Sequence, residues 1–266
     1  MTTMITGATG HLGSLILKHA LTRLPADRLA VSVRDPKKAE GLGVEVRPGD
    51  FGGPLADTFA GVETLLLVSV DGPDEIRIQK HHNAVRAAVD AGVKHIVYTS
   101  VSDADTSPLD LAKVHKATEE AIRATGIPFT FLRNGMYHEN YLPHAPGPIV
   151  SATGDGRIAS ASRDDLALAA AVVLSTPGHE NAVYELTGPR AWSFDELAAL
   201  VGTTHEKVSA ADRVTGLKGF GLPDFLAELL ADIEVNISRG ALAEVRPDLE
   251  KLIGRAATTI EDAVRA

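Results

Sequence analysis

The segment GATGHLG at residues 7–13 constrains the fold of this chain more than any other. It follows a short apolar run that ends at Thr6, and a run with helical character, residues 14–18, comes directly after it. A strand, a glycine-rich turn and a helix in this order build a phosphate site, because glycines admit a ligand close to the backbone and the helix N-terminus presents free N–H groups. The spacing GxxGxxG is one residue looser than the GxGxxG fingerprint and still predicts a dinucleotide site. We expect the loop itself to bind the cofactor, through Gly7, Thr9, Gly10, His11, Leu12 and Gly13.

Strand-like and helical runs alternate through the first half of the chain. We expect strands at 4–6, 29–33, 44–46, 64–68, 95–99 and 129–132, and helices at 79–91 and 108–125, the latter capped by Ser107. This alternation is typical of right-handed crossovers and a parallel sheet. The predicted fold class is therefore α/β, a doubly wound parallel sheet (Rossmann fold) with a smaller, mostly helical C-terminal lobe.

The regular alternation of strand-like and helical runs ends after Leu132, and we expect the chain to form two structural parts. Residues 1–142 form the dinucleotide-binding domain, and residues 143–266 form a smaller substrate-side lobe that is interleaved with it. A chain of 266 residues is long enough for one large core and an appended lobe.

Helix starts and one late strand are predicted within the second part. Asp164 or Asp165 begins an alanine-rich helix, and residues 183–186 read as a strand. Capping boxes begin at Ser193 and Thr258, where a hydroxyl is followed three residues later by glutamate.

Composition excludes several classes of function. The chain has no cysteine, which excludes disulfides, thiolate metal sites and cysteine catalysis. Its net charge of −9 opposes binding to nucleic acid or an anionic membrane. We see no secretory signal and no apolar stretch long enough to cross a bilayer, so we expect a cytoplasmic protein. No metal is expected either, since the adjacent His81 and His82 point apart on a helix.

The end of the second strand discriminates between the two coenzymes. A carboxylate there binds ribose hydroxyls, whereas a cation pairs with the additional phosphate of NADP. Arg34 comes first and Lys38 adds positive charge, which favours NADPH, while Asp35 keeps NADH open. The alternative interpretation is that Arg34 and Lys38 are solvent-exposed charges at the start of a helix. Asp50 and Phe51, after the third strand, fit an adenine rim, although Phe51 is equally suited to the core.

These segments together resemble the atypical short-chain dehydrogenase/reductase branch that includes the NmrA-like proteins. The resemblance rests on the glycine loop, the Arg34 turn, residues 50–52 and residues 79–83. Later segments are similar to the bacterial type 2 NAD(P)H:quinone oxidoreductases and the related triphenylmethane dye reductases: 98–100, 106–109, 132–137, 139–141, 154–156, 158–161, 184–186, 221–224 and 252–255.

The resemblance implies a nicotinamide hydride passed to a quinone or a similar conjugated acceptor. Most short-chain reductases place a tyrosine and a lysine four residues apart on one helix, but here Leu111 occupies the tyrosine place and His115 the lysine place. We therefore expect no catalytic proton donor. A quinone delocalises the arriving charge and takes its proton from water, whereas a simple ketone needs a general acid.

The resemblance also implies further cofactor contacts, at Val68, Ser69, Val70, Ser100, His115, Asn134 and Tyr137. His115 would bond the nicotinamide ribose, Asn134 the carboxamide, and Tyr137 would form an aromatic wall. Each has a structural alternative: His115 as a histidine packed in a helix groove, Asn134 as a turn residue, and Tyr137 as a lobe-packing residue.

Two other functions stay open. An NmrA-like regulator would bind the dinucleotide and sense its redox state without turnover, and the missing tyrosine agrees with that as well. An epimerase or alcohol dehydrogenase is disfavoured because it needs the absent Tyr and Lys. The expected partner is a small-molecule acceptor, and the sequence carries no signal for an oligomeric state.

Overall fold

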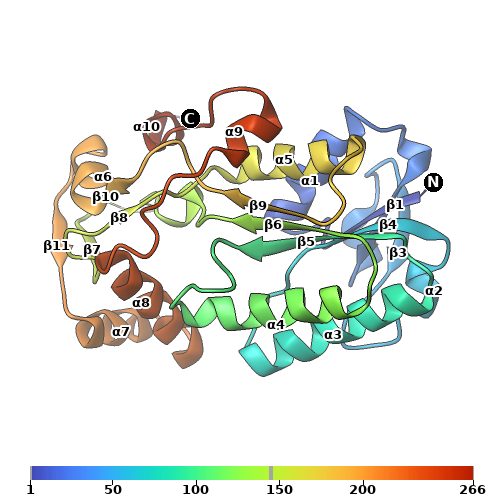
Figure 1. Cartoon of the computed structure of the whole chain (residues 1–266). Coiled ribbons are helices and arrows are strands. Elements are labelled where there is room, and N and C mark those ends of the chain that lie inside the picture. The colour runs from blue at the N-terminus through green and yellow to red at the C-terminus, as the bar shows by residue number, and fades with distance from the viewer. Residues whose placement is uncertain (1, 144–145, 266) are drawn as a thin grey trace.

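A seven-stranded parallel sheet forms the centre of the computed structural model, which describes residues 2–143 and 146–265. Its strand order is β3-β2-β1-β4-β5-β6-β9, with helices on both faces (Figure 1), which confirms the predicted α/β class. The strands are β1 (Thr2–Thr6), β2 (Leu29–Val33), β3 (Glu45–Pro48), β4 (Val62–Leu67), β5 (His95–Val101), β6 (Phe129–Asn134) and β9 (Ala182–Leu186).

The helices that cover the sheet come from both halves of the chain. One face carries α1 (His11–Leu21), α5 (Arg163–Ser175) and α9 (Asp248–Ile253). The other carries α2 (Ala56–Phe59), α3 (Asp74–Asp90) and α4 (Asp110–Ala124), and Figure 1 shows α3 and α4 side by side below the sheet. Both faces are buried, which explains the nearly continuous apolar run of β4: Leu65 and Leu67 face the second group of helices and Leu66 faces the first.

The remaining elements gather beyond the carboxyl ends of β5 and β6, at the left of Figure 1. They pack around a third core that includes Met136, Trp192 and Ile237. They are β7 (Ile149–Ser151), β8 (Arg157–Ile158), β10 (Trp192–Ser193), β11 (His205–Lys207), α6 (Phe194–Leu200), α7 (Ala210–Gly219), α8 (Asp224–Ser238) and α10 (Ile260–Arg265). Two short two-stranded sheets, β10-β8 and β11-β7, connect them.

The late strand predicted at 183–186 joins the main sheet. As β9 it pairs in parallel with β6, with Leu132 opposite Tyr184. Residues from beyond 143 thus supply both the last strand of the sheet and, in α5, one of its covering helices.

Several predicted helix starts need correction. α4 begins at Asp110, with Leu109 as its N-cap, because Ser107 belongs to a turn in which its N–H bonds the Asp103 carbonyl. α3 begins at Asp74, earlier than the predicted Gln79. Acidic side chains in the first turn suit the positive end of the helix dipole, so the charged run after Pro73 is helical.

The capping boxes are confirmed at one position and corrected at the other. Ser193 accepts the Glu196 N–H at 3.2 Å, as predicted. The second cap is Thr259 rather than Thr258, and it accepts the Asp262 N–H at 3.2 Å. α5 begins at Arg163 and is capped by Ser162, so the predicted aspartates lie inside its first turn.

Candidate functional site

The loop after β1 leaves the N-terminus of α1 bare. Gly7 has a φ of 63°, donates its N–H to the Ser32 carbonyl at 3.0 Å, and accepts the Gly10 N–H at 2.9 Å. Gly10 is the N-cap of α1, and no side chain that the structure describes bonds the N–H groups of the first turn. A Cβ on Gly13 would overlap the Gly7 carbonyl, so only glycine permits this tight approach of helix to loop. The result is a backbone cradle suited to a diphosphate.

The other predicted loop residues divide by exposure. Thr9 and His11 are exposed at the cradle, where side chain or backbone can reach a ligand. Leu12 packs into the core beneath α1, so only its backbone faces the cradle.

The positive turn after β2 lies next to the cradle, since β2 pairs with β1. Arg34 and Lys38 are both exposed there. Asp35 is occupied locally: its carboxylate accepts the Lys37 N–H at 3.2 Å and caps the short helix at residues 36–39. The turn therefore presents a cation, with one carboxylate oxygen held by its own backbone.

The predicted adenine rim separates into an exposed and a buried residue. Asp50 is exposed and accepts the Gly52 N–H at 3.0 Å. Phe51 is buried in the core under α3, and its carbonyl accepts from the Asn83 side chain at 3.2 Å. This is the core placement that the sequence allowed for Phe51.

The segment after β4 is held by side chains from three neighbours. The Val68 N–H donates to the Thr6 hydroxyl at 2.8 Å, and the Ser69 N–H donates to the Thr99 hydroxyl at 2.9 Å. The Val70 N–H donates to His81 Nε2 at 3.1 Å. A Cβ on Gly7 would lie 3.6 Å from the Val68 side chain, so this segment borders the cradle directly.

His115, on α4, is buried and has partners on both ring nitrogens. Arg77 Nη2 donates to Nε2 at 3.3 Å, so Nδ1 carries the proton and donates to the Tyr98 hydroxyl at 2.9 Å. Burial and the nearby guanidinium of Arg77 hold the pKa of His115 well below its usual range. The ring is thus neutral and occupied internally, which is the packed arrangement, and a bond to the ribose stays a prediction.

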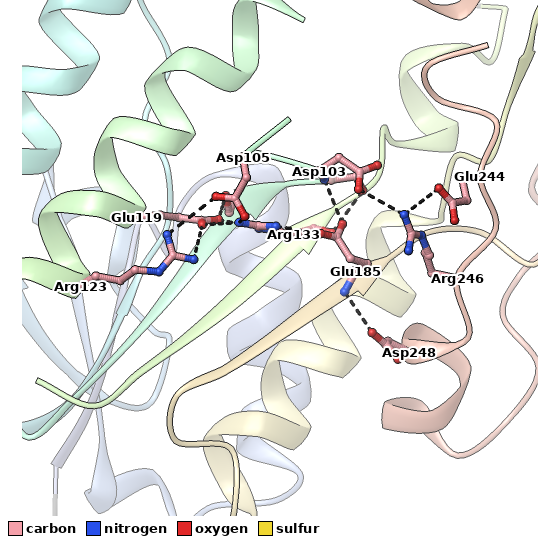
Figure 2. Close-up of polar contacts among 11 residues, drawn as sticks. Asp103, Asp105, Glu119, Arg123, Arg133, Glu185, Glu244, Arg246 and Asp248 are labelled. Carbon is pink, nitrogen blue, oxygen red and sulfur yellow. Dashed lines mark hydrogen bonds and ion pairs between the residues drawn. The ribbon is translucent and has the colours of Figure 1, made fainter. Parts of the chain in front are cut away.

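Ser100 contacts an ion network at the carboxyl ends of β5, β6 and β9, in which Figure 2 shows Glu119, Arg133 and Glu185. Its hydroxyl donates to Glu119 at 2.6 Å, and Glu119 also binds Arg133. Arg133 reaches Glu185 on β9 at 3.1 Å, and Asp103 donates its N–H to the same glutamate at 3.0 Å. The network ties these strand ends to α4.

Asn134 and Tyr137 lie where the chain leaves β6. The Asn134 side-chain oxygen is enclosed and has no hydrogen-bond partner in the described parts of the chain. Tyr137 is half-buried with the Arg163 guanidinium 4.9 Å from its ring centroid, and burial raises the pKa of its phenol. An enclosed acceptor without a partner is costly, so Asn134 is suited to a donor such as a carboxamide N–H.

Residues 7–177 match a protein-family model described as NAD(P)H-binding. This span includes the cradle, the Arg34 turn, His115 and Asn134. The chain belongs to the NAD(P)H-binding family.

Relatives in this NAD(P)H-binding family match almost end to end. Quinone oxidoreductase 2 of Escherichia coli is 46% identical over 276 residues, which cover 98% of this chain and 96% of that protein. The crystal structure of an NADPH-dependent quinone oxidoreductase of E. coli with NADPH superposes with a TM-score of 0.95 at 44% identity, covering 100% of this chain and 99% of that one. Triphenylmethane reductase of Citrobacter sp. with NADP(H) superposes with a TM-score of 0.95 at 41% identity and the same coverage.

The bare cradle and the unpartnered Asn134 oxygen fit the dinucleotide that gives this NAD(P)H-binding family its name. The strand order reverses between β1 and β4, and ligands of such sheets lie outside the carboxyl ends at that point. The adenine half would then extend over β2 toward Arg34, and the nicotinamide half over β4, β5 and β6. Within residues 2–143 and 146–265, no cluster of histidine and acidic side chains is arranged to hold a metal ion. No helix in those same ranges is sufficiently long and apolar to cross a bilayer.

Sequence reasoning missed the residues that fix the segment after β4. Thr6, Thr99 and His81 bond its backbone, and Arg77 lies beneath it. A polar residue at the end of an apolar strand is a weak signal for such a role. Arg77 gives no signal at all, because it sits in a charged run that reads as solvent-facing.

Proposed function

We propose that this chain is an NADPH-dependent oxidoreductase that passes a hydride to a quinone or a similar conjugated acceptor without a Tyr/Lys pair. We also place this reaction in the cytoplasm, in keeping with a chain that has no cysteine. The relatives support the reaction class, since the quinone oxidoreductase and the triphenylmethane reductase are each named for a conjugated acceptor.

The observation that carries the proposal is what α4 holds at the two positions where other short-chain reductases have the catalytic tyrosine and lysine. Leu111 packs against the third core, and His115 is neutral with both nitrogens engaged. A ketone reductase needs a group there that releases a proton near neutral pH. Tyr137 is the nearest phenol to Asn134 along the chain, and its raised pKa makes it a poorer acid.

In this proposal the protein positions the cofactor and the acceptor and supplies no general acid or base. The cradle and Arg34 would hold the phosphates, and Asn134 would hold the carboxamide. Tyr137 would form one wall of the acceptor slot. When bound, the reduced nicotinamide supplies the hydride, and placing it against an acceptor gives most of the rate enhancement.

Steady-state oxidation of NADPH with a panel of neutral quinones tests the proposal. We expect turnover with quinones and none with a simple aliphatic ketone. If the protein binds NADPH by calorimetry but oxidises it with no quinone, the proposed activity is wrong and the cofactor-sensing alternative takes its place.

A further inference from the structure

Arg77, on α3, is a buried cation with no anionic partner among residues 2–143 and 146–265. Only 5% of its surface is exposed. Nε donates to the Val70 carbonyl at 2.7 Å, and Nη2 donates to the Ser69 hydroxyl at 3.1 Å and to His115 Nε2 at 3.3 Å. None of these described partners is a carboxylate. Arg133, a second buried arginine of this protein, is paired in the usual way, since three carboxylates surround its guanidinium.

Burying a guanidinium without an anionic partner costs free energy, because the charge loses its hydration and gains no ion pair in return. The neighbouring histidines do not share this charge. Burial, followed by the Arg77 charge, lowers the pKa of His81 to about 3, and the same causes lower that of His115. The guanidinium therefore carries the positive charge, while His81 and His115 are neutral. Because its burial is unfavourable, we expect a functional role for Arg77.

The charge lies where the nicotinamide half and the acceptor are expected. Its three bonds reach Ser69 and Val70, in the segment that follows β4, and His115 on α4, and the resemblance implies a cofactor contact at each of these three residues. Its remaining nitrogen, Nη1, makes no hydrogen bond to a described residue and is not among the fully enclosed side-chain atoms that lack one. The guanidinium therefore lies beside these predicted cofactor contacts, where its burial leaves its field little screened by water.

We propose that Arg77 determines which acceptors this protein reduces, by favouring those that become anions over those that begin as cations. This inference rests on the proposed function. A hydride carries one proton and two electrons. Added to a neutral quinone, it gives a hydroquinone monoanion, which then takes a proton from water. Added to a cationic triphenylmethane dye, it forms one C–H bond and gives a neutral product.

The two reactions respond to Arg77 in opposite directions. Its charge stabilises the forming anion of the quinone and repels the cationic dye. NADPH becomes NADP⁺ in both reactions, so any effect on the donor ring cancels when the two acceptors are compared. The ratio of kcat/KM for the quinone to that for the dye isolates the contribution of Arg77.

The experiment measures this ratio with menadione and crystal violet. We expect Arg77→Met to lower the ratio by about tenfold or more, the effect of removing one partly screened charge from the vicinity of the acceptor. Arg77→Lys should keep the wild-type ratio because it keeps the charge. Arg86→Met removes an exposed arginine from the same helix and should leave the ratio unchanged.

Ser69→Asp tests the charge without removing the arginine. The new carboxylate would lie beside the guanidinium, in place of the hydroxyl that accepts from Nη2. We expect the ratio to fall in this variant as in Arg77→Met, even if Arg77→Met proves unstable. A parallel loss with both acceptors in all of these variants would show that Arg77 only anchors the segment, and the inference would be overturned.

A binding measurement separates this inference from the proposed activity. The absorbance of 4-nitrophenol bound in the presence of NADP⁺ reports the pKa of that phenol in the proposed acceptor site. We expect a higher bound pKa in Arg77→Met than in the wild type, by about one unit. Equal values would overturn the role of Arg77. Failure of the wild type to oxidise NADPH with either acceptor would instead overturn the proposed function, and the nitrophenol titration would still decide the role of Arg77.

Discussion

The guanidinium of Arg133 on β6 meets the carboxylate of Glu119 on α4 side-on, with Nε 2.9 Å from Oε1 and Nη2 2.7 Å from Oε2 (Figure 2). Glu119 is fully buried, and Asp105 and Glu185 bind the same guanidinium. Such a pair is strongly stabilising only relative to a variant that lacks one partner, because the charge left behind is buried alone.

We therefore expect Arg133→Met to lower the free energy of unfolding by about 3–5 kcal/mol, measured by urea denaturation. The double variant Arg133→Met/Glu119→Leu should lose less than the sum of the single variants. Additive losses would show that the pair is not coupled.

Arg34→Ala should weaken NADPH binding by about 1.5–3 kcal/mol, the scale of a charge-assisted hydrogen bond, and change NADH binding little. Titration calorimetry with both coenzymes measures the difference. Arg28, an exposed arginine at the other end of β2, provides the matched control, and Arg28→Ala should leave both affinities unchanged. An equal loss for both coenzymes would mean that Arg34 does not contact the phosphate.

Gly13→Ala should abolish dinucleotide binding and lower stability, because the added Cβ overlaps the Gly7 carbonyl and displaces the loop. Gly216→Ala, in the open interior of α7, meets nothing and should stabilise the fold by up to about 1 kcal/mol. Thermal unfolding with and without NADPH measures both effects. Normal NADPH binding by Gly13→Ala would contradict the proposed cradle.

Asn134→Ala should change the stability of the free protein little, since the enclosed oxygen bonds no described residue and only the contact of the amide with Tyr137 is lost. The additional stability that NADPH confers should fall by about 1 kcal/mol, the worth of one hydrogen bond. Asn236 on α8 has a similarly enclosed oxygen and serves as the control, whose replacement by alanine should leave the NADPH effect intact. If both variants respond alike to NADPH, Asn134 does not bind the cofactor.

The pH dependence of stability should carry the signature of His81. Its Nε2 accepts from Val70, so Nδ1 carries the proton and donates to Thr118 at 2.9 Å, and protonation would break this pattern. The pKa falls from 6.5 in the unfolded chain to about 3 in the fold. The histidine therefore contributes full stability above pH 6.5 and loses it as the pH falls toward 3.

Urea denaturation between pH 7 and pH 5 checks this slope, in a window above the range where most carboxylates titrate. His81→Gln, which does not titrate, should show a flatter dependence, with a difference of up to about 1.4 kcal/mol per pH unit below 6.5. Identical slopes would show that His81 protonates as freely in the folded protein as in the unfolded chain.

The fold was predictable where local pattern decides it. The apolar run 29–33 became β2 without a shift, because both faces of a central parallel strand are buried and every residue in it must be apolar or small. The cap at Ser193 followed from local chemistry in the same way. At the second capping box, Thr258 and Thr259 are adjacent and equally able to cap, so the sequence alone did not select Thr259.

The site was only partly predictable, because its polar contacts join segments distant in the chain. Nothing near Arg77 indicates that it bonds His115 on another helix, or that Phe51 turns into the core while Asp50 faces solvent. The cradle was accessible to sequence reasoning because glycine spacing and helix start lie in one short segment. The surroundings of the acceptor depend on tertiary packing.

The folded-back carboxylate of Asp35 bears on how coenzyme preference changes in evolution. On the proposed role of Arg34, deleting its charge would weaken NADPH binding without creating a site for the NADH ribose, because one oxygen of the neighbouring Asp35 already caps the short helix at residues 36–39. A lineage that converted to NADH would then also have to reshape this turn and release the Asp35 carboxylate toward the ribose, so that two changes would be linked.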